Sequence, residues 1–242
     1  MRQGGTRRCF AATTDRGEAA LTGHWIARAG RGRYPIGVRC EPLDFPPGEG
    51  PFRARGTVLA GFMHYADARF PGGRAGLRAR LGDPALAAYF DRIFLATSYY
   101  DLGPLLQAAA LLAREERTPI AAFIRERARA SAKADVTGIY ATVLKAGSVE
   151  AMAKKLPWAF CRYFEGVGAE LLATAGDGIE FRFSGLPAAM LGWYVWSNQG
   201  FVGESLRLAG AATAKVETVA VEADGDRDGI PLEAVIQRAT WA

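Results

Sequence analysis

Few residues of this chain have types and spacing that could support chemistry, and the most suggestive run lies near its end. In Asp224-Gly-Asp-Arg-Asp-Gly229 the carboxylates alternate as they do in a calcium loop. A twelve-residue loop of the EF-hand type needs a glutamate at its twelfth position, where Val235 stands. Aspartate and glycine are also the residues that tight turns require. The run therefore predicts a hairpin turn rather than a metal site.

Single nucleophiles and bases occur without partners near them in the sequence. His64 lies in an apolar helical run, where it is either a structural residue or a haem ligand or acid–base group. Cys161 lies in an aromatic run, where it is either a small core residue, a reactive thiol or a site of acylation. We find no Ser/His/Asp set, phosphate-cradling glycine loop or dinucleotide fingerprint. We therefore expect no enzymatic activity, no metal and no cofactor.

Aromatic residues gather in the apolar stretch from 190 to 208, which has helical character. Trp193 and Trp196 are three positions apart and are expected to share a face of this helix. Residues at this density are either core packed on a sheet or the apolar wall of a ligand pocket. On the second interpretation, the wall consists of Trp193, Trp196, Phe201, Tyr140 and Phe164.

Charge divides the chain into two parts. Residues 1–55 hold ten arginines and five acidic residues, while the remainder has twenty basic and twenty acidic residues. We expect residues 1–50 to be a basic, disordered leader or extension, with a nucleic-acid or membrane contact as the alternative. Residues 51–242 are expected to form a single ligand-binding-like domain. The charge run 125–129 is expected to be a solvated helix face, so this domain should bind no nucleic acid.

The order of the predicted elements favours an α+β fold, with a helical N-terminal part packed on a small antiparallel sheet. Asp83-Pro84 and Thr118-Pro119 are typical helix starts. Helices are expected at 58–66, 84–93, 102–114, 119–132, 135–145, 149–156 and from Pro157 onward, with a short one at 75–81. A C-terminal β-α-β-β unit follows, with strands at 179–184, 214–221 and 232–241 around the helix 190–208.

Three stretches carry a family likeness. Gly138-Ile-Tyr140, Ser148-Val-Glu-Ala-Met and Trp158-Ala-Phe-Cys-Arg-Tyr-Phe-Glu-Gly166 resemble the middle of 4-vinyl-reductase-like domains, and the β-α-β-β tail resembles theirs. Those domains are similar to the haem nitric-oxide-binding domain, to subunits of the transport protein particle and to uncharacterised bacterial sensory proteins. The resemblance implies a helix–sheet fold with a cavity that relatives use for small or lipid-like ligands.

The sequence departs from that family at its metal and haem positions. Many 4-vinyl-reductase-like domains carry cysteines around the last hairpin, whereas this hairpin contains none. Haem-binding relatives place a histidine on a central helix, and residues 65–242 contain no histidine. The family's metal and haem functions therefore do not carry over residue by residue.

The function expected from the sequence is a non-enzymatic sensory or small-ligand-binding domain that holds an apolar molecule between helices and sheet. The alternative is a dimerising interaction module with a filled core and no ligand. Three unclustered cysteines, Cys9, Cys40 and Cys161, favour a reducing, cytoplasmic compartment. No apolar run is long enough to span a membrane. A homodimer is expected.

Overall fold

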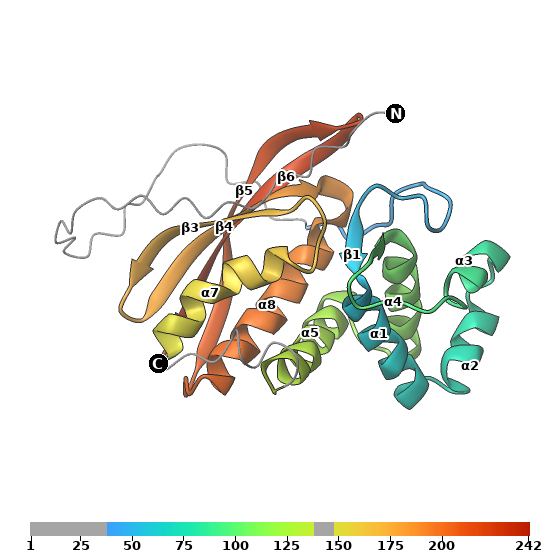
Figure 1. Ribbon diagram of the computed structural model, residues 1–242, viewed down its shortest axis with the longest axis horizontal. Helices are drawn as coiled ribbons and strands as arrows, with labels where there is room; N and C mark the ends of the chain where they lie inside the picture. Colours follow the sequence, from blue (N-terminus) through green and yellow to red (C-terminus); the bar gives the residue numbers. More distant parts are fainter. Residues whose placement is uncertain (1–37, 138–147) are drawn as a thin grey trace. The chain divides into compact units, whose positions relative to one another are not determined.

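The computed structural model describes residues 38–137 and 148–242, which belong to one unit of the chain. Its helices are α1 (Gly56–Arg69), α2 (Gly73–Arg80), α3 (Pro84–Tyr89), α4 (Gly103–Glu115), α5 (Ile120–Thr137), α7 (Val149–Cys161) and α8 (Leu191–Leu208) (Figure 1). Its strands are β1 (Arg53–Arg55), β2 (Tyr99–Asp101), β3 (Gly168–Ala175), β4 (Gly178–Pro187), β5 (Ala214–Arg227) and β6 (Ile230–Trp241). The expected α+β class and the order β4-α8-β5-β6 are confirmed.

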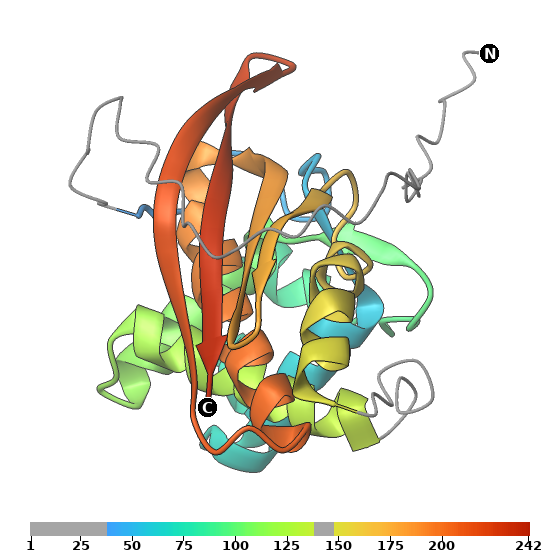
Figure 2. The same cartoon turned by 90° about the vertical axis from the view of Figure 1, so that its left-hand side faces the viewer.

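Four strands form an antiparallel sheet in the order β3-β4-β6-β5. Its alternation is clear on β4, where Phe181 and Phe183 are buried under α7 and α8, while Glu180 and Arg182 face outward. The outer face carries ion pairs, such as that between Arg238 and Glu180 at 2.9 Å. The sheet therefore has one apolar, buried face and one polar face. Figure 2 shows the β5–β6 hairpin extending past the end of the neighbouring hairpin.

The start of α3 follows the predicted sequence signal. Asp83 caps α3 by accepting a hydrogen bond of 2.8 Å from the backbone N–H of Ala85, with Pro84 at the first helical position. Pro157 was expected to start a new helix, and this is wrong, because it lies inside a continuous α7. The predicted helix 135–145 falls mostly outside the described residues.

Strand β3 was not predicted, and the predicted turn was too long. β3 pairs with β4 from Gly168 to Ala175, in a stretch without apolar alternation. β5 continues to Arg227 and β6 starts at Ile230, so the reversal itself occupies only Asp228 and Gly229, both with positive φ. Asp224 instead accepts a hydrogen bond of 2.8 Å from Arg182.

Residues 38–50 make hydrogen bonds with the rest of the domain. The backbone N–H of Gly192 donates to the carbonyl of Arg39 at 2.6 Å. The buried carboxylate of Asp101 accepts hydrogen bonds of 3.0 Å from the backbone N–H groups of Gly48 and Gly50. The expected boundary at residue 50 stays a prediction, and these contacts give a reason to place the start of the folded unit earlier.

Candidate functional site, a cavity between helices

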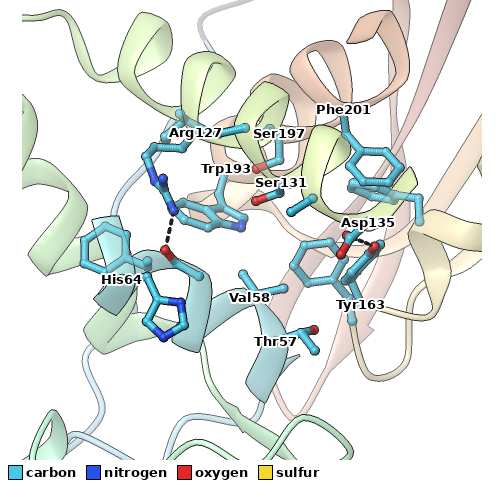
Figure 3. A pocket seen from close by; sticks show the side chains of 18 residues that line it. Thr57, Val58, His64, Arg127, Ser131, Asp135, Tyr163, Trp193, Ser197 and Phe201 are labelled. Atoms are coloured by element: carbon cyan, nitrogen blue, oxygen red, sulfur yellow. Dashed lines mark hydrogen bonds between the residues drawn. The ribbon is translucent and has the colours of Figure 1, made fainter. Parts of the chain in front are cut away.

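A cavity of about 280 Å³ lies between α1, α5, α7 and α8 (Figure 3). None of its lining residues comes from a strand, so it does not lie between helices and sheet as expected. It is open near His64, Ala130 and Ala134, which are exposed. Eighteen residues line it: Thr57, Val58, Gly61, Phe62, His64, Ile124, Arg127, Ala128, Ala130, Ser131, Ala134, Asp135, Phe160, Tyr163, Phe164, Trp193, Ser197 and Phe201.

Two helical glycines explain where the helices meet and where they leave space. A Cβ atom on Gly200 of α8 would lie 2.2 Å from the backbone oxygen of Arg125, so α5 and α8 approach each other closely there. A Cβ atom on Gly61 of α1 would meet no atom within 4 Å. The cavity therefore exists because α8 is pressed against α5 at one point while α1 presents no side chain at another.

Most of the cavity wall is apolar and aromatic. Tyr163 and Phe201 pack edge to face with ring centroids 5.5 Å apart, and Phe160 packs on Phe164 at 5.0 Å. Trp193 is 6% exposed and lies with its ring near the middle of the cavity. These rings come from α7, the turn after it and α8, so three segments of the chain build one aromatic wall.

Arg127 places a guanidinium group at one end of the cavity. Its Nη2 donates a hydrogen bond of 2.7 Å to the carbonyl of Gly61, and its guanidinium lies 4.3 Å from the ring centroid of Tyr65. Burial lowers the pKa of Arg127 to about 10, although Tyr65 and Glu116 act in the opposite direction. The guanidinium is thus a partly desolvated cation.

Asp135 places a carboxyl group at the other end, and the hydroxyl of Tyr163 donates a hydrogen bond to its Oδ2. Burial raises the pKa of Asp135 above its ordinary value, although this hydrogen bond acts to lower it. Figure 3 shows Arg127 and Asp135 on opposite sides of the cavity, with Trp193 and Ser131 between them. The cavity therefore carries an ionisable group at each end.

Three polar groups of the lining are buried without a hydrogen-bond partner among the described residues. They are the hydroxyl of Thr57, the Nε of Arg127 and the indole Nε1 of Trp193. Buried polar atoms are satisfied in most native structures, so each unsatisfied atom calls for an explanation. All three can donate a hydrogen bond, and a ligand with an acceptor atom would satisfy them.

The expected pocket residues separate into three groups. Trp193, Phe201 and Phe164 line the cavity. Trp196 does not, because its ring lies over Gly192 near Cys40 on another side of α8. Tyr140 lies outside the described residues. The role of all five in ligand binding stays a prediction.

Sequence reasoning missed the polar ends of the cavity. Arg127 was assigned to a solvated face and is instead half-buried, and Asp135 was read only as the start of a helix. Spacing alone gave no signal, because eight positions on one helix are about 2.2 turns and the two side chains leave the helix roughly 80° apart.

No model of a known protein family matches this chain, and no curated protein matches it. Solved structures do match. The Cs H-NOX protein carrying 4-cyano-L-phenylalanine aligns with a TM-score of 0.55 at 14% identity, over 77% of this chain and 96% of that chain. An oxygen-binding H-NOX domain related to soluble guanylate cyclases, in its oxygen complex, gives 0.54 at 13% identity, over 77% and 94%.

An Fe(II) unliganded H-NOX mutant from K. algicida gives a TM-score of 0.53 at 8% identity, over 78% of this chain and 96% of that chain. Likeness at these identities establishes the fold alone. The expected haem nitric-oxide-binding-like fold is therefore confirmed. The likeness to 4-vinyl-reductase-like domains and to transport-particle subunits stays a prediction.

The residues of this cavity do not fit a haem. His64 is the one histidine of the described residues, and it is exposed at the mouth of the cavity with its ring turned away from Trp193 (Figure 3). Tyr163, another residue type that ligates haem iron, bonds to Asp135. The described residues also contain no group of three or more His, Cys, Asp or Glu that could hold a metal ion.

Proposed function

We propose that this domain is a non-enzymatic, small-ligand-binding domain of the sensory type, which holds an apolar or aromatic molecule in the cavity between α1, α5, α7 and α8. The observation that carries the proposal is the cavity itself, with mainly apolar walls and a few polar groups. This combination is typical of small-molecule sites. The similar structures include an H-NOX domain in its oxygen complex and H-NOX proteins with a distorted haem, which supports a ligand-binding role for the fold.

The volume of the cavity limits the size of the ligand. An apolar cavity of about 150 Å³ admits benzene, so about 280 Å³ takes roughly ten to fifteen non-hydrogen atoms. That corresponds to one ring with substituents or to two fused rings. A tetrapyrrole is several times larger than one ring, which is a second reason to expect another ligand than haem.

Partner and location remain part of the proposal. We propose a homodimer, supported by the exposed apolar side chains of Ile93 and Leu95, which are 82% and 59% accessible. We propose a cytoplasmic location, since the three cysteines of the sequence, Cys9, Cys40 and Cys161, are few and form no spaced cluster. None of the helices in the described ranges is long and apolar enough to cross a membrane.

The proposal is tested by offering ring compounds to the whole chain. Toluene, indole and benzoate are titrated calorimetrically against the parent, against Gly61→Leu and against Gly61→Ala. Leucine projects into the cavity, whereas alanine makes the same helix change without filling it. We expect the parent and Gly61→Ala to bind at least one compound and Gly61→Leu to bind none.

Native mass spectrometry of protein purified from its own host provides the second measurement. A retained molecule of the expected size supports the proposal. If no ring compound binds the parent and no molecule is retained, the domain is a packed interaction module rather than a ligand-binding one.

A further inference from the structure

The two ends of the cavity carry different polar groups. Arg127 and Asp135 are eight residues apart on α5, which corresponds to about 12 Å along the helix. Both line the same cavity, with the ring of Trp193 and the small side chain of Ser131 between them (Figure 3). One end therefore carries a cation and the other a carboxyl group, separated by the ring of Trp193. A ligand that matches this pattern must itself differ at its two ends.

The Arg127 end and the middle of the cavity present donors that lack acceptors. The Nε of Arg127 and the Nε1 of Trp193 are buried and have no hydrogen-bond partner among the residues described. Among the described residues, Glu116 is the carboxylate that acts electrostatically on Arg127, and it accepts a hydrogen bond from Tyr65. A ligand carboxylate can accept charge-assisted hydrogen bonds from the unsatisfied donors, since it combines negative charge with several lone-pair sites. The chemistry of this end selects an anionic acceptor.

The Asp135 end presents an acceptor. Its Oδ2 already accepts a hydrogen bond from Tyr163, which fixes the side chain, and a carboxylate can accept further bonds. A ligand hydroxyl or amino group supplies the donor. The rings of Tyr163 and Phe201 border this end and exclude a bulky substituent. The chemistry of this end selects a small donor group on a flat ring.

We propose that the cavity selects a one-ring aromatic acid with a hydroxyl or amino group opposite its carboxylate, the carboxylate bound by Arg127 and Trp193 and the opposite group by Asp135. This inference rests on the proposed function and names the class of its ligand. The size agrees, because such a molecule has about ten non-hydrogen atoms, within the range set by the cavity volume.

The test uses the full chain and four probes that differ by one group each: 4-hydroxybenzoate, benzoate, phenol and toluene. Calorimetric titration should give about tenfold tighter binding of 4-hydroxybenzoate than of benzoate or phenol, because each loses one charge-assisted hydrogen bond. Toluene should bind most weakly. Equal affinity for all four probes would overturn the inference.

Two near-isosteric variants assign the ends. Trp193→Phe keeps an aromatic ring and removes the indole N–H, so it should weaken 4-hydroxybenzoate and benzoate by about five- to tenfold. Asp135→Asn should weaken 4-hydroxybenzoate by a larger factor than benzoate. Trp196→Phe is the matched control, since Trp196 lies on the same helix outside the cavity. The same loss in Trp193→Phe and Trp196→Phe would count against the assignment.

The outcomes separate this inference from the proposed function. If toluene binds the parent and is blocked by Gly61→Leu, while 4-hydroxybenzoate shows no advantage, the cavity binds ligands but the ligand class is wrong. If none of the four probes binds, the proposed function fails with it. Thermal unfolding of each variant shows whether it is folded, and where one is not, the four-probe comparison on the parent decides.

Discussion

Gly61→Leu should make the ligand-free protein more stable, which is unusual for an enlargement in a helix contact. Gly61 lies inside α1 and lines the cavity, and a side chain there meets no atom within 4 Å at its first carbon. Glycine inside a helix costs about 1 kcal/mol relative to alanine. Burying a leucine side chain contributes about 1.5–3 kcal/mol when it is fully removed from water. Because the cavity is open at one side, we expect only part of this contribution, about 1 kcal/mol.

The free energy of unfolding should therefore rise by roughly 2 kcal/mol in Gly61→Leu and by about 1 kcal/mol in Gly61→Ala. Urea unfolding measures both changes directly. In a domain of this size, a change of 1 kcal/mol moves the melting temperature by about 2–4 °C. Leucine should then raise it by about 4–8 °C and alanine by about half as much. The same leucine should abolish ligand binding, so stability and binding move in opposite directions.

Two results would refute this reasoning. If Gly61→Leu is less stable than Gly61→Ala, the space beside α1 does not exist in solution and the helices close over it. If Gly61→Leu is more stable and still binds ring compounds with the affinity of the parent, the ligand occupies another part of the molecule.

Three further predictions concern the elements that frame the cavity. Gly200→Ala should lower the free energy of unfolding by about 1–3 kcal/mol, because its Cβ would lie 2.2 Å from the backbone oxygen of Arg125. Urea unfolding of Gly200→Ala and Gly61→Ala, measured side by side, checks this prediction. It would be contradicted if both substitutions changed the free energy of unfolding in the same direction. Burial raises the pKa of Asp135 in the folded state, so ionisation of this group costs stability as pH rises from about 4 through the raised pKa. The free energy of unfolding of Asp135→Asn should therefore rise relative to that of the parent between pH 4 and pH 7, as measured by urea unfolding at both pH values. An equal change with pH in the two proteins would argue against this. A chain that starts at residue 34 should keep the melting temperature of the whole protein, whereas a start at residue 51 should lower it by several degrees, because the hydrogen bonds of residues 38–50 are lost; equal melting temperatures would instead place the boundary at residue 50.

The parts of the fold that could be predicted are those in which local pattern and tertiary structure agree. The alternation on β4 and β6 matches a sheet with one buried and one wet face. Asp83-Pro84 starts a helix because its capping geometry is local. β3 could not be predicted, since it is an edge strand with mostly exposed residues, and its pairing with β4 is the interaction that makes it a strand.

The candidate site was predicted only as far as one helix allows. Trp193 and Trp196 differ by three positions, and which of them faces a cavity depends on where α5 packs against α8 and on the space that α1 leaves at Gly61. That packing is set by Gly200, whose contact with Arg125 is remote in sequence. Arg127 resembled the arginines around it, and only its position over Tyr65 and beside Gly61 distinguishes it from a solvated residue.

The cost of the cavity bears on the choice between a ligand-binding domain and a packed interaction module. At about 24 cal/mol per Å³, a dry cavity of this volume would cost roughly 7 kcal/mol, which is comparable to the whole stability of a typical domain. Solvent access reduces that cost but leaves the indole N–H of Trp193 and the hydroxyl of Thr57 buried without partners among the described residues. A side chain at Gly61 would remove much of the cost, since it meets no obstacle. An interaction module gains nothing from leaving this space unfilled, whereas a ligand-binding domain requires it.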